Sequence, residues 1–294
     1  MQRFLNYFTQ GTQDTVTAGK IGIEIETDFT FADGTPITET VSQHILRSTF
    51  GKPHDSTLKL ELGRQKIEIN IEPQVTFKML WERTQCGLKW LYTTAAEYGA
   101  QPVFQPIFSW PDPLLYVQEE RDEIWVQLDG RSALEHLCRC SAVQFTIDVN
   151  PKDAIPFINA LHRSTLVSNG FKANDKKWQQ YMADTTAKYA PLRYGGPKSF
   201  LSLEDYVTKL TEHKVVMHKS QPVYMRPEDV NDLNIDLYLR SIWWHYRLRR
   251  YGNSLCLEIR PFPRLRDEDI PQMWQTVADI LKTALHPQLS IPVS

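Results

Sequence analysis

Residues 243–261 read WWHYRLRRYGNSLCLEIRP, and this stretch gives the strongest indication of the fold and its site. After a run of arginines and a glycine turn, the alternation of side chains predicts a strand over residues 255–261. Side chains two apart on a strand point to the same face, so Glu258 and Arg260 lie side by side. Taken alone, such a pair is more often an ion pair in contact with solvent. It also suits a site that must hold both a metal ion and a phosphate.

A second acidic strand is predicted near the N-terminus, over residues 20–31. Isoleucines alternate there with Glu24 and Glu26, so the two glutamates share one face. In a half-exposed strand these carboxylates would face water. In a curved sheet that encloses a polar cavity they would face a ligand.

A third acidic strand is predicted over residues 65–72, paired as a hairpin with residues 57–62. Glu68 lies there on the polar face, opposite three isoleucines, whereas the face of Glu61 depends on the turn at Gly63. Three strands that each offer inward carboxylates make a magnesium–nucleotide site the leading hypothesis.

Composition narrows the class of protein. The 294 residues are 41% hydrophobic with a net charge of −2, which gives no electrostatic reason to expect a nucleic acid or a membrane as partner. The start of the chain is not typical of a secretory signal, and no segment has the length and apolarity of a membrane span. The four cysteines have no zinc-site spacing, and Cys138 and Cys140 are predicted to share a strand face as reduced thiols. We therefore expect a cytoplasmic globular protein.

The remaining pattern predicts one α+β domain over residues 1–285, with a largely antiparallel sheet flanked by helices. Residues 138–149 alternate as a strand, residues 169–199 read as an irregular loop, and residues 286–294 as a weakly structured tail. Apolar spacing and capping residues predict helices over residues 77–98, 153–168, 203–211, 231–244 and 268–285.

Four segments in this order resemble the glutamate–cysteine ligase family, of the plant and proteobacterial type, within the carboxylate–amine ligases that share the glutamine synthetase catalytic fold. The similar segments cover residues 4–29, 58–73, 138–148 and 247–260, and include GIEIETDF, LKLELGRQKIEINIEP and CRCSAVQFTID. The resemblance implies a sheet curved into a funnel, with ATP and Mg²⁺ at one end and amino-acid substrates near the other. ATP would phosphorylate a side-chain carboxylate, and an amine would attack the acyl phosphate to form an amide. Glutamate and cysteine, which give the glutathione precursor γ-glutamylcysteine, are the pair that this family implies.

The resemblance also assigns roles to individual residues. Arg260 would grip the transferring phosphate or a substrate carboxylate, with Glu258 beside it. Gln144 and Thr146 would touch ATP or a metal-bound water. The implied magnesium ligands are Glu24, Glu26, Glu68 and Glu258.

Several other residues keep two interpretations. Arg247, Arg249 and Arg250 would steer an anionic substrate, but at the helical spacing expected for them only some can face the site. Arg139 is either a site residue or a surface residue. The pair Trp243–Trp244 is either the floor of an adenine pocket or part of the core. His245 is given no role.

Residues 174–181, NDKKWQQY, depart from the family, which has an aromatic–Arg–Ser stretch at this place. Because this region frames the amino-acid pocket, the acid and amine that are joined stay open. The alternatives are a ligase of the same fold for another acid–amine pair, and a non-catalytic relative that binds a nucleotide or a partner protein.

Overall fold

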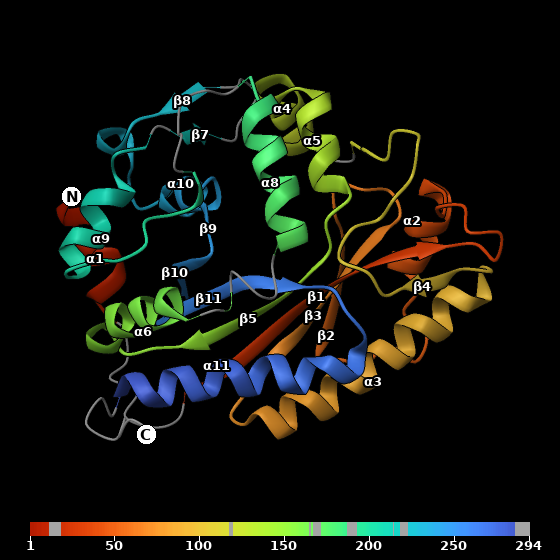
Figure 1. Cartoon of the computed structure of the whole chain (residues 1–294), viewed down its shortest axis with the longest axis horizontal. Coiled ribbons are helices and arrows are strands. Elements are labelled where there is room, and N and C mark those ends of the chain that lie inside the picture. The colour runs from red at the N-terminus through yellow and green to blue at the C-terminus, as the bar shows by residue number, and fades with distance from the viewer. Residues whose placement is uncertain are drawn as a thin grey trace, which may run out of the picture.

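The computed structural model describes residues 1–11, 19–117, 120–164, 166, 172–186, 193–213, 215–217 and 223–285. Its main feature is an antiparallel sheet in the order β10-β11-β5-β1-β3-β2, with β4 pairing with β1 (Figure 1). The strands of this sheet are β1 (Ile21–Thr30), β2 (Ser56–Leu60), β3 (Lys66–Gln74), β4 (Gln101–Val103), β5 (Ala142–Asp148), β10 (Tyr246–Tyr251) and β11 (Ser254–Pro263). The α+β class with a largely antiparallel sheet is confirmed.

Helices cover both faces of the sheet. They are α1 (Gln2–Thr9), α2 (Glu39–Arg47), α3 (Phe77–Glu97), α4 (Glu120–Asp129), α5 (Arg131–Cys138), α6 (Pro151–Arg163), α8 (Lys172–Asp184), α9 (Leu203–Leu210), α10 (Ile235–Arg240) and α11 (Ile270–Leu285), with short 3₁₀ turns at Pro227–Asp229 and Asp267–Asp269. Two small sheets complete the described part of the chain: β6 (Tyr194–Gly195) pairs in parallel with β9 (Trp243–Trp244), and β7 (Val215–Met217) is antiparallel to β8 (Val223–Met225).

The apolar face of the sheet packs on α3 and α11, which lie on one side of it in Figure 1. Phe145 of β5 touches Phe77 of α3 and Trp274 of α11, with ring centroids 6.5 and 5.4 Å away. Ile25 and Ile69 are fully buried on the same face, as the alternation predicts. The opposite face, which carries Glu24 and Glu68, is therefore directed toward α4, α5 and α8 (Figure 1).

Three predicted elements differ from the structure. Residues 138–149 are not one strand, because α5 continues to Cys138 and β5 begins only at Ala142, so Cys138 and Cys140 do not share a strand face. The predicted loop 169–199 contains the helix α8, whose Trp178 and Tyr181 pack on Trp243. The predicted helix 231–244 is shortened to α10, because the chain turns back into β9 and β10. The predicted tail 286–294 lies outside the described residues.

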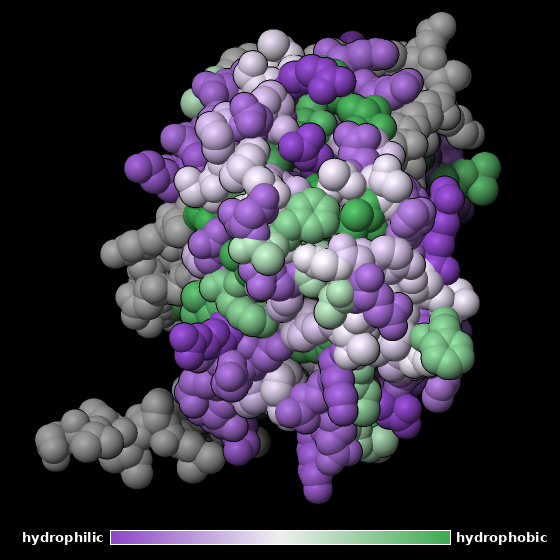
Figure 2. Space-filling view, turned by 90° about the vertical axis from the view of Figure 1, so that its right-hand side faces the viewer, coloured by the Kyte–Doolittle hydropathy of each residue, from purple (hydrophilic) through white to green (hydrophobic). Residues whose placement is uncertain are grey.

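The surface visible in Figure 2 is mainly hydrophilic. Figure 2 shows hydrophilic side chains over most of one face, with apolar ones scattered singly or in small groups among them. No helix in the described ranges is both long and apolar enough to cross a membrane.

Candidate active site

A cavity of about 860 Å³ lies on the polar face of the sheet. Its floor comes from β1, β2, β3, β5, β10 and β11, and α4 and α5 contribute side chains such as Trp125 and Leu134 to its wall. Glu24, Glu26, Glu68, Gln144, Thr146, Arg247, Glu258 and Arg260 all line it. The structure thus brings together these eight side chains, all of which were proposed from the sequence.

Strand register explains why these side chains meet. Glu24 of β1 lies opposite Gln144 of β5 and Asn70 of β3, and Glu26 lies opposite Glu68. On the other side of β5, Glu258 pairs with Thr146. Since paired residues in neighbouring strands project their side chains to the same face, the polar positions form continuous rows across the floor.

Glu24 is a partly buried carboxylate on the acidic side of the cavity. Its carboxylate makes no hydrogen bond and no ion pair with the described residues, although it lines the cavity. Burial, with repulsion from Glu68 and Glu258, raises the pKa of Glu24 to about 8. A cation beside this carboxylate would remove the cost of ionising it.

Glu68 is held more firmly than Glu24. Asn70 Nδ2 donates to Glu68 Oε1 at 2.7 Å, and the Lys59 ammonium lies 3.3 Å from the same oxygen. The second carboxylate oxygen of Glu68 accepts no bond from Asn70 or Lys59, and Glu68 still lines the cavity.

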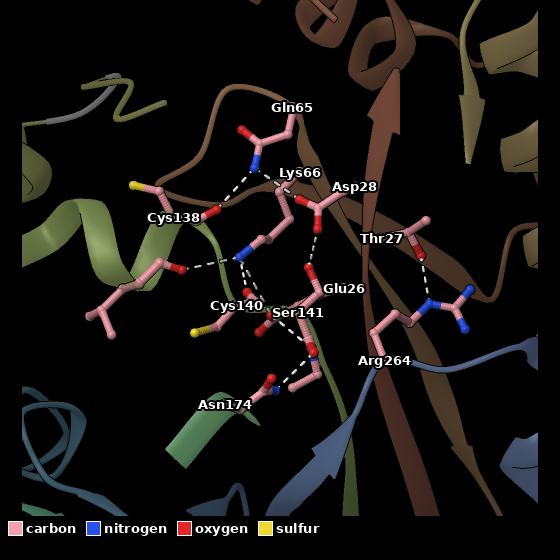
Figure 3. A network of polar contacts seen from close by, with 12 residues as sticks. Glu26, Thr27, Asp28, Gln65, Lys66, Cys138, Cys140, Ser141, Asn174 and Arg264 are labelled. Atoms are coloured by element: carbon pink, nitrogen blue, oxygen red, sulfur yellow. Dashed lines mark hydrogen bonds and ion pairs between the residues drawn. The ribbon is translucent and has the colours of Figure 1, made fainter. Parts of the chain in front are cut away.

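Glu26 joins the cavity to a buried network (Figure 3). Its carboxylate accepts from the Ala142 amide at 3.1 Å and from Gln144 Nε2 at 3.3 Å. Burial raises the pKa of Glu26 to about 7, even though Lys66, 3.9 Å away, opposes the shift. The Lys66 ammonium also donates to the backbone carbonyls of Leu137 and Cys140, and Figure 3 labels the second of these partners.

The same network ties the strands to the helical layer. Asp28 accepts from Gln65 Nε2 at 2.9 Å and from the Ser141 hydroxyl at 2.7 Å, and Asn174 of α8 donates to the Ser141 carbonyl at 2.9 Å (Figure 3). Lys66 and Asp28 could not be singled out from the sequence, because their partners lie between 37 and 113 residues away in the chain.

The basic side of the cavity is formed by β10 and β11. Arg247 contacts Glu258 Oε2 through Nη2 at 2.5 Å and Nε at 2.7 Å, and the Tyr251 hydroxyl donates to Oε1 at 2.9 Å. Burial opposes ionisation of Glu258, but Arg247, Arg260 and Arg249 together lower its pKa to about 2. Arg247 takes up Oε2 of Glu258 and Tyr251 bonds to Oε1, and the role of Glu258 as a magnesium ligand stays a prediction.

Arg247, Arg249 and Arg250 lie on the strand β10, and not on a helix as their expected spacing implied. Strand alternation therefore determines which of them face the cavity. Arg247 and Arg249 both line the cavity, whereas Arg250 points away and donates to the carbonyls of Gly252 and Tyr7 at 2.8 and 3.2 Å. Of the three arginines proposed to steer an anionic substrate, the cavity lining includes Arg247 and Arg249 and excludes Arg250. Arg260 lies 3.7 Å from Glu258 and faces the cavity.

Two further predictions concern residues beside the cavity. Arg139 caps the end of α5 and donates to the carbonyls of Trp110 and Asp112, and it is not part of the lining of this cavity. Trp243 lines the cavity, whereas Trp244 packs in the core against Phe200 and Tyr206.

A smaller pocket of about 170 Å³, here called the annex, opens beside the main cavity. Glu26, Gln144 and Arg260 line both spaces, so the two are contiguous. His245 belongs to the annex wall, where its Nε2 lies 3.0 Å from the Tyr194 hydroxyl oxygen. That hydroxyl donates to Asp175 Oδ1 at 2.8 Å.

The donor set of the main cavity fits magnesium by its chemistry. Mg²⁺ prefers oxygen ligands, needs only one or two carboxylates, and keeps water or substrate phosphates in its other positions. In the described part of the chain, no group of three acidic, histidine or cysteine side chains is arranged to hold a metal ion by itself. Glu24 and Glu68 are two of the carboxylates that line the cavity and could hold such an ion, while the phosphates of a nucleotide would complete its coordination.

No protein-family model matches the sequence, and no curated protein matches it either. Among solved structures, the fold is similar to a bifunctional glutathione synthetase from Pasteurella multocida, with a TM-score of 0.49 and 13% identity over 90% of this chain and 38% of that one. It is also similar to glutamate–cysteine ligase from Francisella tularensis in complex with AMP, with a TM-score of 0.48 and 10% identity over 90% of this chain and 67% of that one. A third similar structure is a glutamine synthase homologue, with a TM-score of 0.42 and 10% identity over 92% of this chain and 56% of that one. This chain therefore spans well under two thirds of the first and third of these proteins.

Proposed function

We propose that this protein is an ATP- and magnesium-dependent ligase that joins a carboxylate to an amine. The observation that carries the proposal is the division of charge across one cavity. Glu24, Glu26 and Glu68 lie on its β1–β3 side, and Arg247, Arg249 and Arg260 lie on its β10–β11 side. Such a cavity suits a polyphosphate that is bound by arginines on one flank and by a cation on the other.

The residues divide the work as follows. Glu24 and Glu68 hold Mg²⁺, which when bound offsets the negative charge on the phosphates. Arg260 and Arg249 grip the transferring phosphoryl group through their planar donors. Arg247 is committed to Glu258, so this pair fixes the arginine side of the cavity in place.

The chemistry follows from the difficulty of amide formation. A carboxylate is a poor electrophile because its oxygen is a poor leaving group. In the first step a carboxylate oxygen attacks the terminal phosphorus of ATP, the bond from that phosphorus to the bridging oxygen breaks, and ADP leaves. In the second step the amine nitrogen attacks the acyl carbon and loses a proton, while the carbon–oxygen bond to phosphate breaks. The arginines stabilise the negative charge that moves between oxygens in both steps.

Glutamate as the acid and cysteine as the amine are the first pair to test, because the sequence resembles the glutamate–cysteine ligases. The experiment is magnesium-dependent release of ADP with a panel of amino acids, singly and in pairs. ADP release with glutamate and cysteine would support that pair, and release with another pair would support the ligase with a different specificity. Binding of Mg-ATP without turnover for any pair would favour a nucleotide-binding relative without this activity.

A further inference from the structure

The annex has the size of one side chain. Its volume of about 170 Å³ is close to that of an engineered apolar cavity of about 150 Å³ that holds a benzene molecule. It opens to the main cavity at Arg260 and Gln144, where the proposed chemistry takes place. A substrate whose reacting group lies at this junction could therefore place its side chain in the annex.

The annex wall is aromatic, and Trp178, Tyr194 and Trp243 each have one ring face in use. Trp178 and Tyr194 stack on each other, with centroids 4.9 Å apart and planes at 2°. The Arg193 guanidinium lies 3.8 Å from the centroid of the Trp243 ring. Cations bind the faces of aromatic rings, whereas ring edges carry partial positive charge and attract the face of another ring. The wall therefore suits an aromatic occupant better than a cation.

Charges in the wall point to the same conclusion. Lys66 and Arg260 line the annex and would repel a cationic side chain. Glu26 and Glu61 line it as well and would repel an anionic one. These two acidic and two basic side chains cancel in net charge, so the wall as a whole attracts neither a cation nor an anion.

Asn174 adds a polar feature to this wall. The residue is only 1% exposed, and its Nδ2 is fixed by the Ser141 carbonyl at 2.9 Å. Its Oδ1 has no hydrogen-bond partner among the described residues. A buried acceptor without a partner can be satisfied by a donor on a bound molecule, such as the ring N–H of histidine, whereas phenylalanine has no such donor.

We propose that the annex binds the planar, uncharged ring of an amino-acid substrate. The assignment of the occupant as a substrate rests on the proposed function. In a ligase that activates a side-chain carboxylate, an amino acid with a ring side chain enters the reaction as the amine. The thiol side chain of cysteine is much smaller than the annex and leaves most of it unfilled. Two of the wall residues, Asn174 and Trp178, come from the segment 174–181 that departs from the family pattern.

The test is calorimetric binding of phenylalanine, histidine, cysteine and lysine to the full-length chain at pH 8, with and without Mg-ATP. Trp178→Ala and the milder Trp178→Leu remove the stacked wall. Trp81→Ala is the matched control, because Trp81 also stacks on an aromatic ring, Phe77, but on the opposite face of the sheet. Far-ultraviolet circular dichroism shows whether each variant is folded.

We expect phenylalanine or histidine to bind about tenfold more tightly than cysteine and lysine, a ratio that the Trp178 variants lose and Trp81→Ala retains. Mg-ATP should bind the Trp178 variants as it binds the unaltered protein. Equal or tighter binding of cysteine or lysine, no binding of any of the four, or an unchanged ratio in a folded Trp178 variant would overturn the assignment of the annex. Ring-selective binding in a protein that does not bind Mg-ATP would support the annex and refute the ligase proposal.

Discussion

Arg247 and Glu258 face each other on β10 and β11, with Nη2 and Nε of the arginine 2.5 and 2.7 Å from the same carboxylate oxygen. Both side chains are buried, and Tyr251 occupies the other oxygen. The pair neutralises one arginine and leaves Arg249 and Arg260 as the basic groups on this side of the cavity. The Arg247–Glu258 pair therefore holds β10 and β11 together beside Arg249 and Arg260, the arginines that we assign to phosphate binding.

Replacing Glu258 should destabilise the fold as well as the site. Glu258→Gln leaves the buried Arg247 without a counter-ion, and removal of one partner from a buried pair costs about 3–5 kcal/mol. Urea denaturation measures this loss, and Glu268→Gln on an exposed turn is the control. Equal stability of the two variants would show that the ion pair does not anchor β10 and β11.

Stability in the absence of magnesium should fall as the pH rises from about 5 to 8. The pKa values of Glu24 and Glu26 are raised from 4.5 to about 8 and about 7. Between pH 4.5 and the raised pKa of each glutamate, that glutamate is protonated in the folded chain and ionised in the unfolded chain. The folded chain therefore binds more protons, and the free energy of unfolding decreases with increasing pH.

Chemical denaturation in EDTA at a series of pH values measures this slope. The double variant Glu24→Gln/Glu26→Gln should be less sensitive to pH, and added Mg²⁺ should stabilise the unaltered protein more at pH 8 than at pH 5. The same slope in the double variant would mean that other groups cause it.

Arg260 and Arg250 offer a direct comparison, because one lines the cavity and the other points away from it. Arg260→Lys should lower kcat/KM for ADP release about 100-fold, since a lysine cannot reproduce two parallel donors to phosphate. Arg250→Lys should stay within about twofold of the unaltered enzyme, as expected for a residue that makes no substrate contact. Similar losses in both variants would place Arg250 in the site after all.

Lys66 should be essential for the fold in spite of its place beside the cavity. The residue is 2% exposed, and its ammonium group joins Glu26 to the carbonyls of Leu137 and Cys140. Lys66→Met would leave these groups without their donor and should cost about 3–5 kcal/mol. The melting temperature measures this, with the exposed Lys78→Met on α3 as the control; a melting temperature equal to that of the control would contradict the structural role.

Much of the sheet could be predicted from local alternation. The isoleucines around Glu24 and Glu68 determine which face is apolar, so the shared polar face followed without knowledge of the register. The start of β5 at Ala142 could not be predicted from the sequence. Residues 138–141 continue the alternating pattern of the strand, but in the structure Cys138 is the last residue of α5. A local sequence pattern does not show whether a residue between a helix and a strand will belong to the helix or to the strand.

The annex was beyond sequence analysis for a related reason. Trp178 lies in α8, Tyr194 in β6 and His245 between β9 and β10, and no sequence motif connects the three. The loop predicted around Trp178 is a helix whose aromatic residues pack against Trp243, a contact between residues 65 positions apart that spacing alone does not reveal. Arg249 and Arg250 show the opposite case: once the segment is known to be a strand, alternation alone separates them.

The most direct test of the central claim is to trap the acyl phosphate with hydroxylamine. The protein is incubated with ATP, Mg²⁺ and each candidate acid, and the hydroxamate is detected by mass spectrometry. We predict a hydroxamate of one acid that requires both ATP and Mg²⁺ and is lost in Glu24→Gln. ADP release without any hydroxamate, or no ADP release with any acid, would contradict the assignment of this cavity as the active site of a carboxylate–amine ligase.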